Sequence, residues 1–283
     1  MLFLYRDLAV LYYVIAFAGG FWLFWAQPLP GGEWVNVVAA FLFIVATALF
    51  FNKMVSIRVA KLTKIRMQDL RTRDFLAEVN KLDDGKPRSV RHLFARSYRI
   101  AALTDLGEYR EAERILGNQM PEGKGQKVLP LQISWLNGKA VCLIDRGSFR
   151  EAEQAITAAE SLIGQVRNPN QRALFTRSFE SARQLLRLRE GDLRGQEEFW
   201  MNHYRCAGSP LESLMGTYHL AEVYDRLGRT EERDVCLKYV AETKGDPYVI
   251  RRAREILARA EAESEQPGQA APTKTEGREQ PRD

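Results

Sequence analysis

Two stretches of the sequence read almost alike: Gly107–Leu116 is GEYREAERIL, and Gly147–Ile156 is GSFREAEQAI. In each stretch a glycine is followed two positions later by an aromatic residue and five positions later by an alanine. A phrase that recurs at a spacing of 40 residues indicates a structural repeat, because each copy specifies the same turn and the same packing contact.

Prolines and glycines carry this period through the rest of the region. The prolines stand 43, 39, 41 and 37 residues apart, and the glycines that precede helical patterns stand 40, 44 and 37 apart. They are Pro87, Pro130, Pro169, Pro210 and Pro247, and Gly107, Gly147, Gly191 and Gly228. Each glycine follows a proline by 17 to 22 residues, which predicts a helix, a tight turn and a second helix in every unit.

The local chemistry also favours helices. Asn168, Ser209 and Asp246 each precede a proline and are predicted to cap a helix that begins with that proline. Ser148 and Glu151 have the spacing of a capping box. Apolar residues recur at helical spacing, and no run alternates as a strand would, so the predicted fold class is all-α. The apolar positions are Ile133, Leu136, Ala140, Leu143, Ile144, Phe149, Ala152, Ile156 and Ala159.

The repeated pattern resembles the tetratricopeptide repeat (TPR). The matching residues are Gly107, Tyr109 and Ala112, then Gly147, Phe149 and Ala152. The unit from Gly228 has Arg233 in the place of the alanine, and the unit from Gly191 has Leu193 and Gln196 at the aromatic and alanine positions. The resemblance covers Pro87–Gly245 and implies a TPR-like α-solenoid of helical repeats over residues 86–263. Spacings above the family's period of about 34 residues imply insertions, one of them at 118–127, NQMPEGKGQK.

The resemblance also implies a concave groove that binds a partner. The groove positions implied on the first helices are Phe94, Ser97, Ala101, Asn137, Val141, Ile144, Leu185, Leu188, Tyr218 and Glu222. Of the Lys and Asn pattern with which some members clamp a carboxylate, only Asn137 falls in place. We therefore expect the partner to be a protein segment, a partly apolar peptide or helix.

Two long apolar runs precede the repeats. Leu8–Ala26 carries no charge, and Trp34–Phe51 is apolar apart from Asn36 and Thr47. At ~1.5 Å per residue each run forms a helix of about 27 to 29 Å, close to the ~30 Å of a bilayer's hydrocarbon. The QPLPGGE sequence at 27–33 breaks helix and permits a tight return. We therefore predict a transmembrane hairpin at 1–52 with spans at about 8–26 and 34–51; a cleaved signal peptide and a buried soluble hairpin remain alternatives.

Basic residues follow the second span and precede the first acidic one, Asp69. They are Lys53, Arg58, Lys61, Lys64 and Arg66. By the positive-inside rule we expect a multi-pass protein of the cell membrane with both termini in the cytoplasm. Residues 53–85 are expected as a basic juxtamembrane helix that continues the second span through Leu82. Its basic side chains either face anionic lipid or are simply solvated, and the sequence leaves both open.

Composition limits the remaining possibilities. The 283-residue chain has a formal charge of only +5, and five positive residues lie in the stretch after the second span, so we expect lipid headgroups and not nucleic acid as the acidic partner. Three widely spaced cysteines, Cys142, Cys206 and Cys236, suit a reducing compartment. The tail at 264–283 lacks the apolar residues needed to fold and is expected to be disordered.

Residues that could carry catalysis are few. His203, Cys206, His219 and Cys236 lack the paired spacing of known zinc sites, so we expect no metal and no cofactor. We expect a membrane-anchored, non-enzymatic scaffold or adaptor. A membrane-bound enzyme with an unrecognised site is one alternative. A structural subunit is another, with Gly19 and Gly20 admitting a neighbouring helix of a larger membrane complex.

Overall fold

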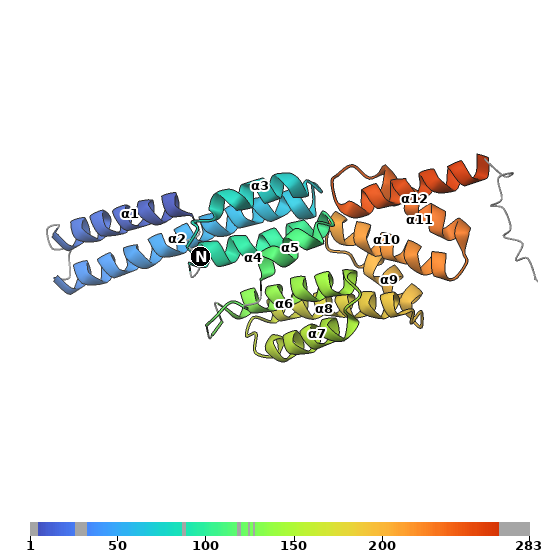
Figure 1. Cartoon of the computed structure of the whole chain (residues 1–283). Helices are drawn as coiled ribbons and strands as arrows, with labels where there is room; N and C mark the ends of the chain where they lie inside the picture. Colours follow the sequence, from blue (N-terminus) through green and yellow to red (C-terminus); the bar gives the residue numbers. More distant parts are fainter. Residues whose placement is uncertain are drawn as a thin grey trace, which may run out of the picture.

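The computed structural model describes residues 5–25, 33–86, 89–117, 120–123, 125–126 and 128–265, and the regular structure in them is entirely α-helical. The helices are α1 (Arg6–Trp25), α2 (Glu33–Met67), α3 (Thr72–Leu82), α4 (Val90–Asp105), α5 (Tyr109–Leu116), α6 (Leu129–Asp145), α7 (Phe149–Ile163), α8 (Pro169–Glu190), α9 (Gln196–Arg205), α10 (Pro210–Arg226), α11 (Thr230–Glu242) and α12 (Tyr248–Glu265). Figure 1 shows α1 and the first half of α2 projecting from one end of a body built by the other helices. The predicted turn at 27–32 and the predicted tail beyond Glu265 lie outside the described residues.

The two apolar helices form an antiparallel pair. Both are long and apolar enough to cross a membrane. Gly19 belongs to their contact, because a Cβ atom built there would lie 2.4 Å from the ring of Phe43. The outward faces are apolar and exposed, with Phe17 at 78% and Trp34 at 80% exposure. Gly19 therefore permits the close packing of α1 on α2.

The expectation of one helix from Lys53 to Leu82 is wrong. α2 ends at Met67, and the chain turns back before α3 begins at Thr72. Leu70 in this turn adopts a φ of 54°, which is left-handed and uncommon for a leucine. The turn is held from far along the chain, since the carboxylate of Asp246 accepts hydrogen bonds from the backbone N–H groups of Thr72 (2.6 Å) and Arg73 (2.8 Å). α3 therefore packs back on α2 and α4.

The motif that recurs at Gly107–Leu116 and Gly147–Ile156 forms the same turn in both places. Gly107 ends the α4 unit with a φ of 73°, and Gly147 ends the α6 unit with a φ of 80°. After Gly147, the N–H of Ser148 donates to the carbonyl of Leu143 at 2.9 Å, which closes the helix end in a Schellman motif. Glycine adopts this left-handed conformation without steric cost, and this explains its period in the sequence.

The predicted helix caps are partly confirmed. The side chain of Asn168 accepts bonds of 3.0 and 3.1 Å from the first turn of α8, and Ser209 Oγ accepts from the first turn of α10 at 3.3 Å. The cap predicted at Asp246 for its own helix is wrong, because its carboxylate caps α3 instead. Ser148 makes no capping bond to α7; its hydroxyl accepts from Arg146 Nε at 3.2 Å.

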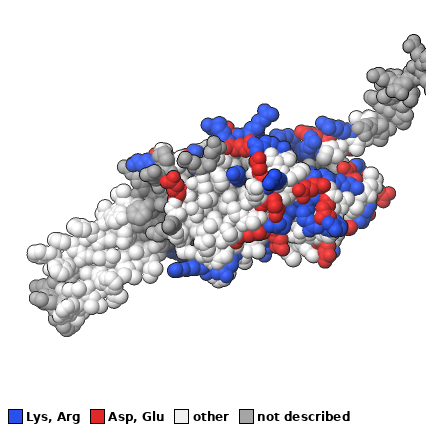
Figure 2. Space-filling model, turned by 60° about the horizontal axis from the view of Figure 1, so that its bottom comes forward, with Lys and Arg blue, Asp and Glu red and all other residues white. Residues whose placement is uncertain are grey.

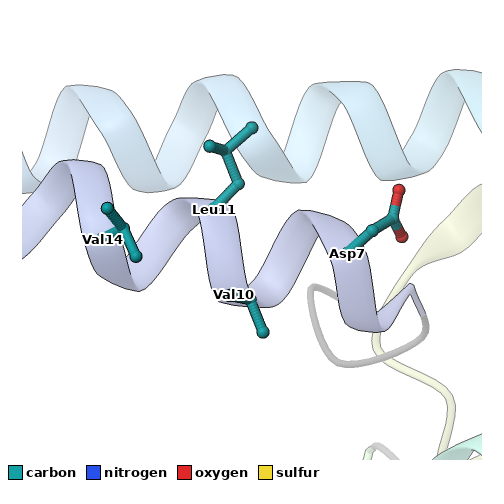
Figure 3. Close-up of a pocket in the computed structure, with 4 residues that line it drawn as sticks. All are labelled: Asp7, Val10, Leu11 and Val14. Carbon is teal, nitrogen blue, oxygen red and sulfur yellow. The ribbon is translucent and has the colours of Figure 1, made fainter.

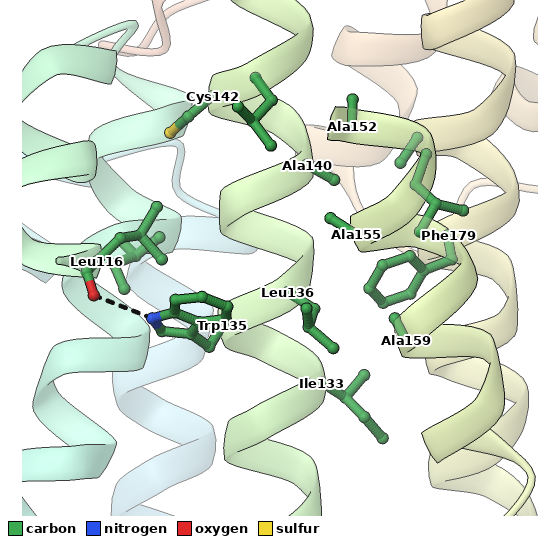
Figure 4. Packing of buried hydrophobic residues seen from close by; sticks show 14 of the residues in the cluster. Leu116, Ile133, Trp135, Leu136, Ala140, Cys142, Ala152, Ala155, Ala159 and Phe179 are labelled. Atoms are coloured by element: carbon green, nitrogen blue, oxygen red, sulfur yellow. Dashed lines mark hydrogen bonds between the residues drawn. The ribbon is translucent and has the colours of Figure 1, made fainter. Parts of the chain in front are cut away.

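The largest apolar core lies between α4 and α8 (Figure 4). Ala112 and Ala152 are both 0% exposed, so the repeated alanines lie inside the packed pairs. Trp135 is buried in the same core, and its Nε1–H donates to the carbonyl of Leu116 at 3.0 Å. The apolar positions predicted for α6 and α7 are confirmed as buried, except that Phe149 is half-buried at the edge of the core.

The two units that depart from the repeat pattern compensate with polar contacts. Gln196, which stands in the place of an alanine, is 0% exposed; its Nε2 donates to Gln184 Oε1 at 3.0 Å, and its Oε1 accepts from Trp200 Nε1 at 2.9 Å. Arg233, in the corresponding place of the next unit, pairs with Asp225 at 2.8 Å. The larger polar residues thus fill these positions with satisfied hydrogen-bonding groups.

Candidate functional site

The groove residues predicted from the sequence lie on α4, α6, α8 and α10 but do not form one open surface. Six are half-buried: Phe94, Ser97, Ala101, Asn137, Val141 and Leu185. Three are buried at 2%, 0% and 4% exposure, namely Ile144, Leu188 and Tyr218. Glu222 has 18% of its side chain exposed. The buried members pack the core, so a partner could reach only the half-buried ones without rearrangement.

The predicted groove is also divided along its length. Phe94 packs on Tyr98 with ring centroids 4.3 Å apart and lies beside the α2 helix, close to the base of the hairpin. Leu188 packs with Trp200 in a separate cluster. Between them, Asn137, Val141 and Leu185 lie on the neighbouring helices α6 and α8. The middle of the predicted groove is therefore one accessible part of it, and the half-buried residues of α4 are the other.

A charged cluster occupies the inner side of α8 and α10. Glu222 accepts a hydrogen bond from His219 Nδ1 at 2.8 Å and pairs with Arg189 at 2.9 Å. Burial alone would raise the pKa of Glu222, but the hydrogen bond from His219 and the charge of Arg189 outweigh it and hold that pKa below its usual range. The His219 ring lies against Trp200 with centroids 4.6 Å apart and is buried, whereas the Arg189 side chain at the other end of the cluster is 31% exposed.

Three tyrosines meet next to this cluster from three different helices. The ring of Tyr248, at the start of α12, lies 6.0 Å from that of Tyr109 and 6.1 Å from that of Tyr218. The Tyr248 side chain also lies directly on Gly107, where an added Cβ would come within 2.9 Å of it. Burial raises the pKa of each of the three hydroxyls above its ordinary value. The start of α12 thus closes the space between the first and last helical pairs with neutral phenols.

The basic residues that follow the apolar first half of α2 divide into three groups. Lys53, Lys61 and Lys64 are exposed. Arg58 pairs with Asp7 at 2.7 Å and ties α1 to α2. Arg66 follows neither alternative, lipid-facing or solvated, because it points inward and forms a two-fold hydrogen bond to the carboxylate of Asp105 on α4. The face of α2 that carries Arg66 therefore belongs to the interior of the helical domain.

An open depression of about 640 Å³ lies on α1 (Figure 3). Its lining consists of Asp7, Val10, Leu11 and Val14. The three apolar side chains are 47–58% exposed, and the Asp7 carboxylate is already paired with Arg58. This depression belongs to the outward face of the hairpin and offers no convergent set of reactive groups.

Within the described residues, no group of three or more His, Cys, Asp and Glu side chains is placed to hold a metal ion. Of the residues considered for zinc, His219 bonds to Glu222, Cys206 is exposed and Cys236 is half-buried. Cys142 is buried in the core of α6, and burial raises its pKa to about 12, so it stays a neutral thiol near neutral pH.

Comparison with known proteins gives no relative: no protein-family model, no curated protein and no solved structure matches this chain.

Proposed function

We propose that this protein is a membrane-anchored TPR-like scaffold that holds a partner protein or peptide near the cytoplasmic face of the cell membrane. The observation that carries the proposal is the continuity of α2, a helix of 35 residues. Its first half belongs to the apolar hairpin, and its second half packs against the helical pairs of the body. A helix shared in this way anchors the body rigidly rather than through a flexible linker.

The surface of the molecule supports the anchoring. In Figure 2 the hairpin is an uncharged rod, whereas both signs of charge cover the body. The exposed large side chains of the hairpin are apolar, as a lipid environment requires. The exposed Lys53, Lys61 and Lys64 follow the second span, and this favours a cytoplasmic body with the turn of the hairpin outside.

The helical pairs support the scaffold role. The turns at Gly107 and Gly147 and the buried alanines at 112 and 152 have the form that the TPR resemblance implies. Stacked helical pairs display long surfaces to partners, and their function is protein binding more often than catalysis. In our proposal the partner contacts the accessible middle of the groove, at Asn137, Val141 and Leu185.

Affinity capture with the full chain and its hairpin intact tests this function. Val141→Glu places a charge in the middle of the groove, and Thr157→Glu places the same charge on the exposed side of α7 as a matched control. We expect one partner protein to co-purify with the parent chain and with the Thr157 variant. The Val141 variant should recover at least tenfold less of that partner. Equal recovery by both variants would place the partner elsewhere and contradict the groove.

A further inference from the structure

We propose that the end of the helical domain nearest to the hairpin is a contact surface for anionic phospholipid headgroups. We call it the membrane-side end and define it by Lys53, Lys86, Met120 and Arg167. It supplies the lipid contact in place of the outer side of α2, where Lys61 and Lys64 lie. This inference rests on the proposed insertion of the hairpin into a bilayer.

The length of α2 separates Lys61 and Lys64 from the bilayer. Phe51 ends the apolar run, and Lys53 follows two residues later. At ~1.5 Å per residue, Lys61 and Lys64 lie about 15 and 20 Å further along the helix axis. Electrostatic attraction in physiological salt decays over ~8 Å. Lys61 and Lys64 are therefore too distant from the headgroups to attract them strongly.

The helices that follow bring other residues back toward the bilayer. Met67 lies about 24 Å beyond Phe51, and α3 returns about 16 Å, so that Leu82 comes back to within about 8 Å of the level of Phe51. Lys86 follows Leu82 and is exposed. Figure 1 shows that the end of α3 and the starts of α4, α6 and α8 all lie on the side of the body that faces the hairpin.

The segments that precede α6 and α8 are tied together at this end. Gln126 donates from Nε2 to the carbonyl of Gln165 at 2.8 Å and accepts at Oε1 from the N–H of Arg167 at 3.0 Å. Gln132 on α6 donates to the carbonyl of Pro121 at 2.9 Å. These bonds hold Met120, 39% exposed, and Arg167, also exposed, on one edge of the domain. Exposed apolar and basic side chains together suit the interfacial region of a membrane.

The charge available at the membrane-side end is mainly positive. Among the described residues, Lys53, Lys86 and Arg167 are exposed and form no ion pair. Of the two acidic residues beside Lys86, Asp83 pairs with His92 and Arg99, whereas Asp84 is half-buried and accepts a hydrogen bond from Ser89 Oγ.

Glu122 is an exposed acidic residue at the same end and offsets one of these charges. In the space-filling view, Lys and Arg side chains, with a smaller number of acidic atoms beside them, lie at the border between the uncharged hairpin and the body (Figure 2). Anionic headgroups are the chemical match for such a border.

The test uses the full chain in nanodiscs of phosphatidylcholine mixed with phosphatidylglycerol, and mass spectrometry counts the phosphatidylglycerol retained with the protein. The pair Lys86→Gln/Arg167→Gln removes two charges from the membrane-side end, and Lys61→Gln/Lys64→Gln removes two from the outer side of α2. We expect the first pair to reduce the preference for phosphatidylglycerol, by roughly fivefold for each charge removed. The second pair should leave the preference close to that of the parent. Equal helicity by circular dichroism shows that both variants fold.

The inference would be overturned if both pairs of substitutions reduced the preference for phosphatidylglycerol equally, or if only the Lys61/Lys64 pair reduced it. A parent chain that resists carbonate extraction from vesicles but shows no preference for phosphatidylglycerol would overturn it while leaving the anchor intact. A parent chain that carbonate extracts would remove the proposed membrane anchoring itself, and the inference with it.

Discussion

Buried polar residues are the part of the interior that the sequence did not reveal. The apolar positions of α6 and α7 follow from helical spacing, since each depends only on neighbours within one turn. Glu222 is different, because its partner Arg189 lies on another helix 33 residues earlier. Asp246 was predicted to cap its own helix, but it caps one that starts 174 residues earlier. Contacts over such separations leave no mark in local periodicity.

At this scale we predict that Glu222→Gln destabilises the protein by roughly 2 to 4 kcal/mol, because it leaves Arg189 and His219 without their carboxylate. The pKa of Glu222 is held low in the folded state, so its contribution is present above its unfolded pKa of about 4.3 and is lost as pH falls through the folded value. The difference from the parent, measured by urea unfolding, should therefore narrow in acid.

Glu160→Gln is the matched control for Glu222. Glu160 is 47% exposed and shares Arg183 with Glu153, so its loss should cost under about 1 kcal/mol. Equal costs for the two substitutions would show that the Glu222 cluster contributes no more than a surface ion pair.

The helical pairs were largely predictable as elements. Glycine and proline mark where each helix ends and begins, because the left-handed turn and the missing N–H are properties of single residues. The break of α2 at Met67 was not predictable in this way. No glycine or proline lies in residues 68–71, and the turn is held by Asp246 from the far end of the chain. A strong local helical pattern therefore gave way to a tertiary contact.

The first prediction at the scale of helices concerns the buried alanines of the repeated motif. Ala112→Phe and Ala152→Phe should each destabilise the protein by roughly 1 to 3 kcal/mol, since both positions are 0% exposed between packed helices. Glu111→Gln and Glu151→Gln, one residue earlier on exposed side chains, should each cost under about 0.5 kcal/mol. Chemical denaturation of the four variants measures this, and glutamate variants as damaging as the alanine variants would show that the helix faces are misassigned.

The second prediction for elements concerns the contact between Asp246 and α3. Asp246→Ala removes the acceptor for the N–H groups of Thr72 and Arg73, and should destabilise the protein by about 1 to 2 kcal/mol. The rate of hydrogen exchange at the backbone amides of Thr72 and Arg73 should rise in the same variant. Asp246→Asn keeps one acceptor oxygen and should cost less. If the asparagine variant lost as much stability and protection as the alanine variant, the hydrogen bonds would not be the cause.

For the whole molecule, the sequence predicted the hairpin and the helical domain as separate parts, and the structure joins them. α2 runs from the hairpin to Met67, where Met67 and Leu70 pack in the same core as Leu214, Tyr218 and Ile250 of the last helical pairs. The beginning and the end of the body thus share one apolar cluster. This closure depends on residues from both ends of the chain, so no single segment of sequence predicts it.

The central claim is that the hairpin spans the membrane with the helical domain in the cytoplasm. The most direct measurement is labelling of Cys206 with a membrane-impermeant maleimide in cells that express the full chain. Cys206 is exposed, whereas Cys142, 2% exposed with a pKa of about 12, stays unlabelled until the protein is unfolded and serves as an internal control. The account predicts no labelling of Cys206 in intact cells and full labelling after the membrane is permeabilised. Labelling of Cys206 in intact cells would contradict it.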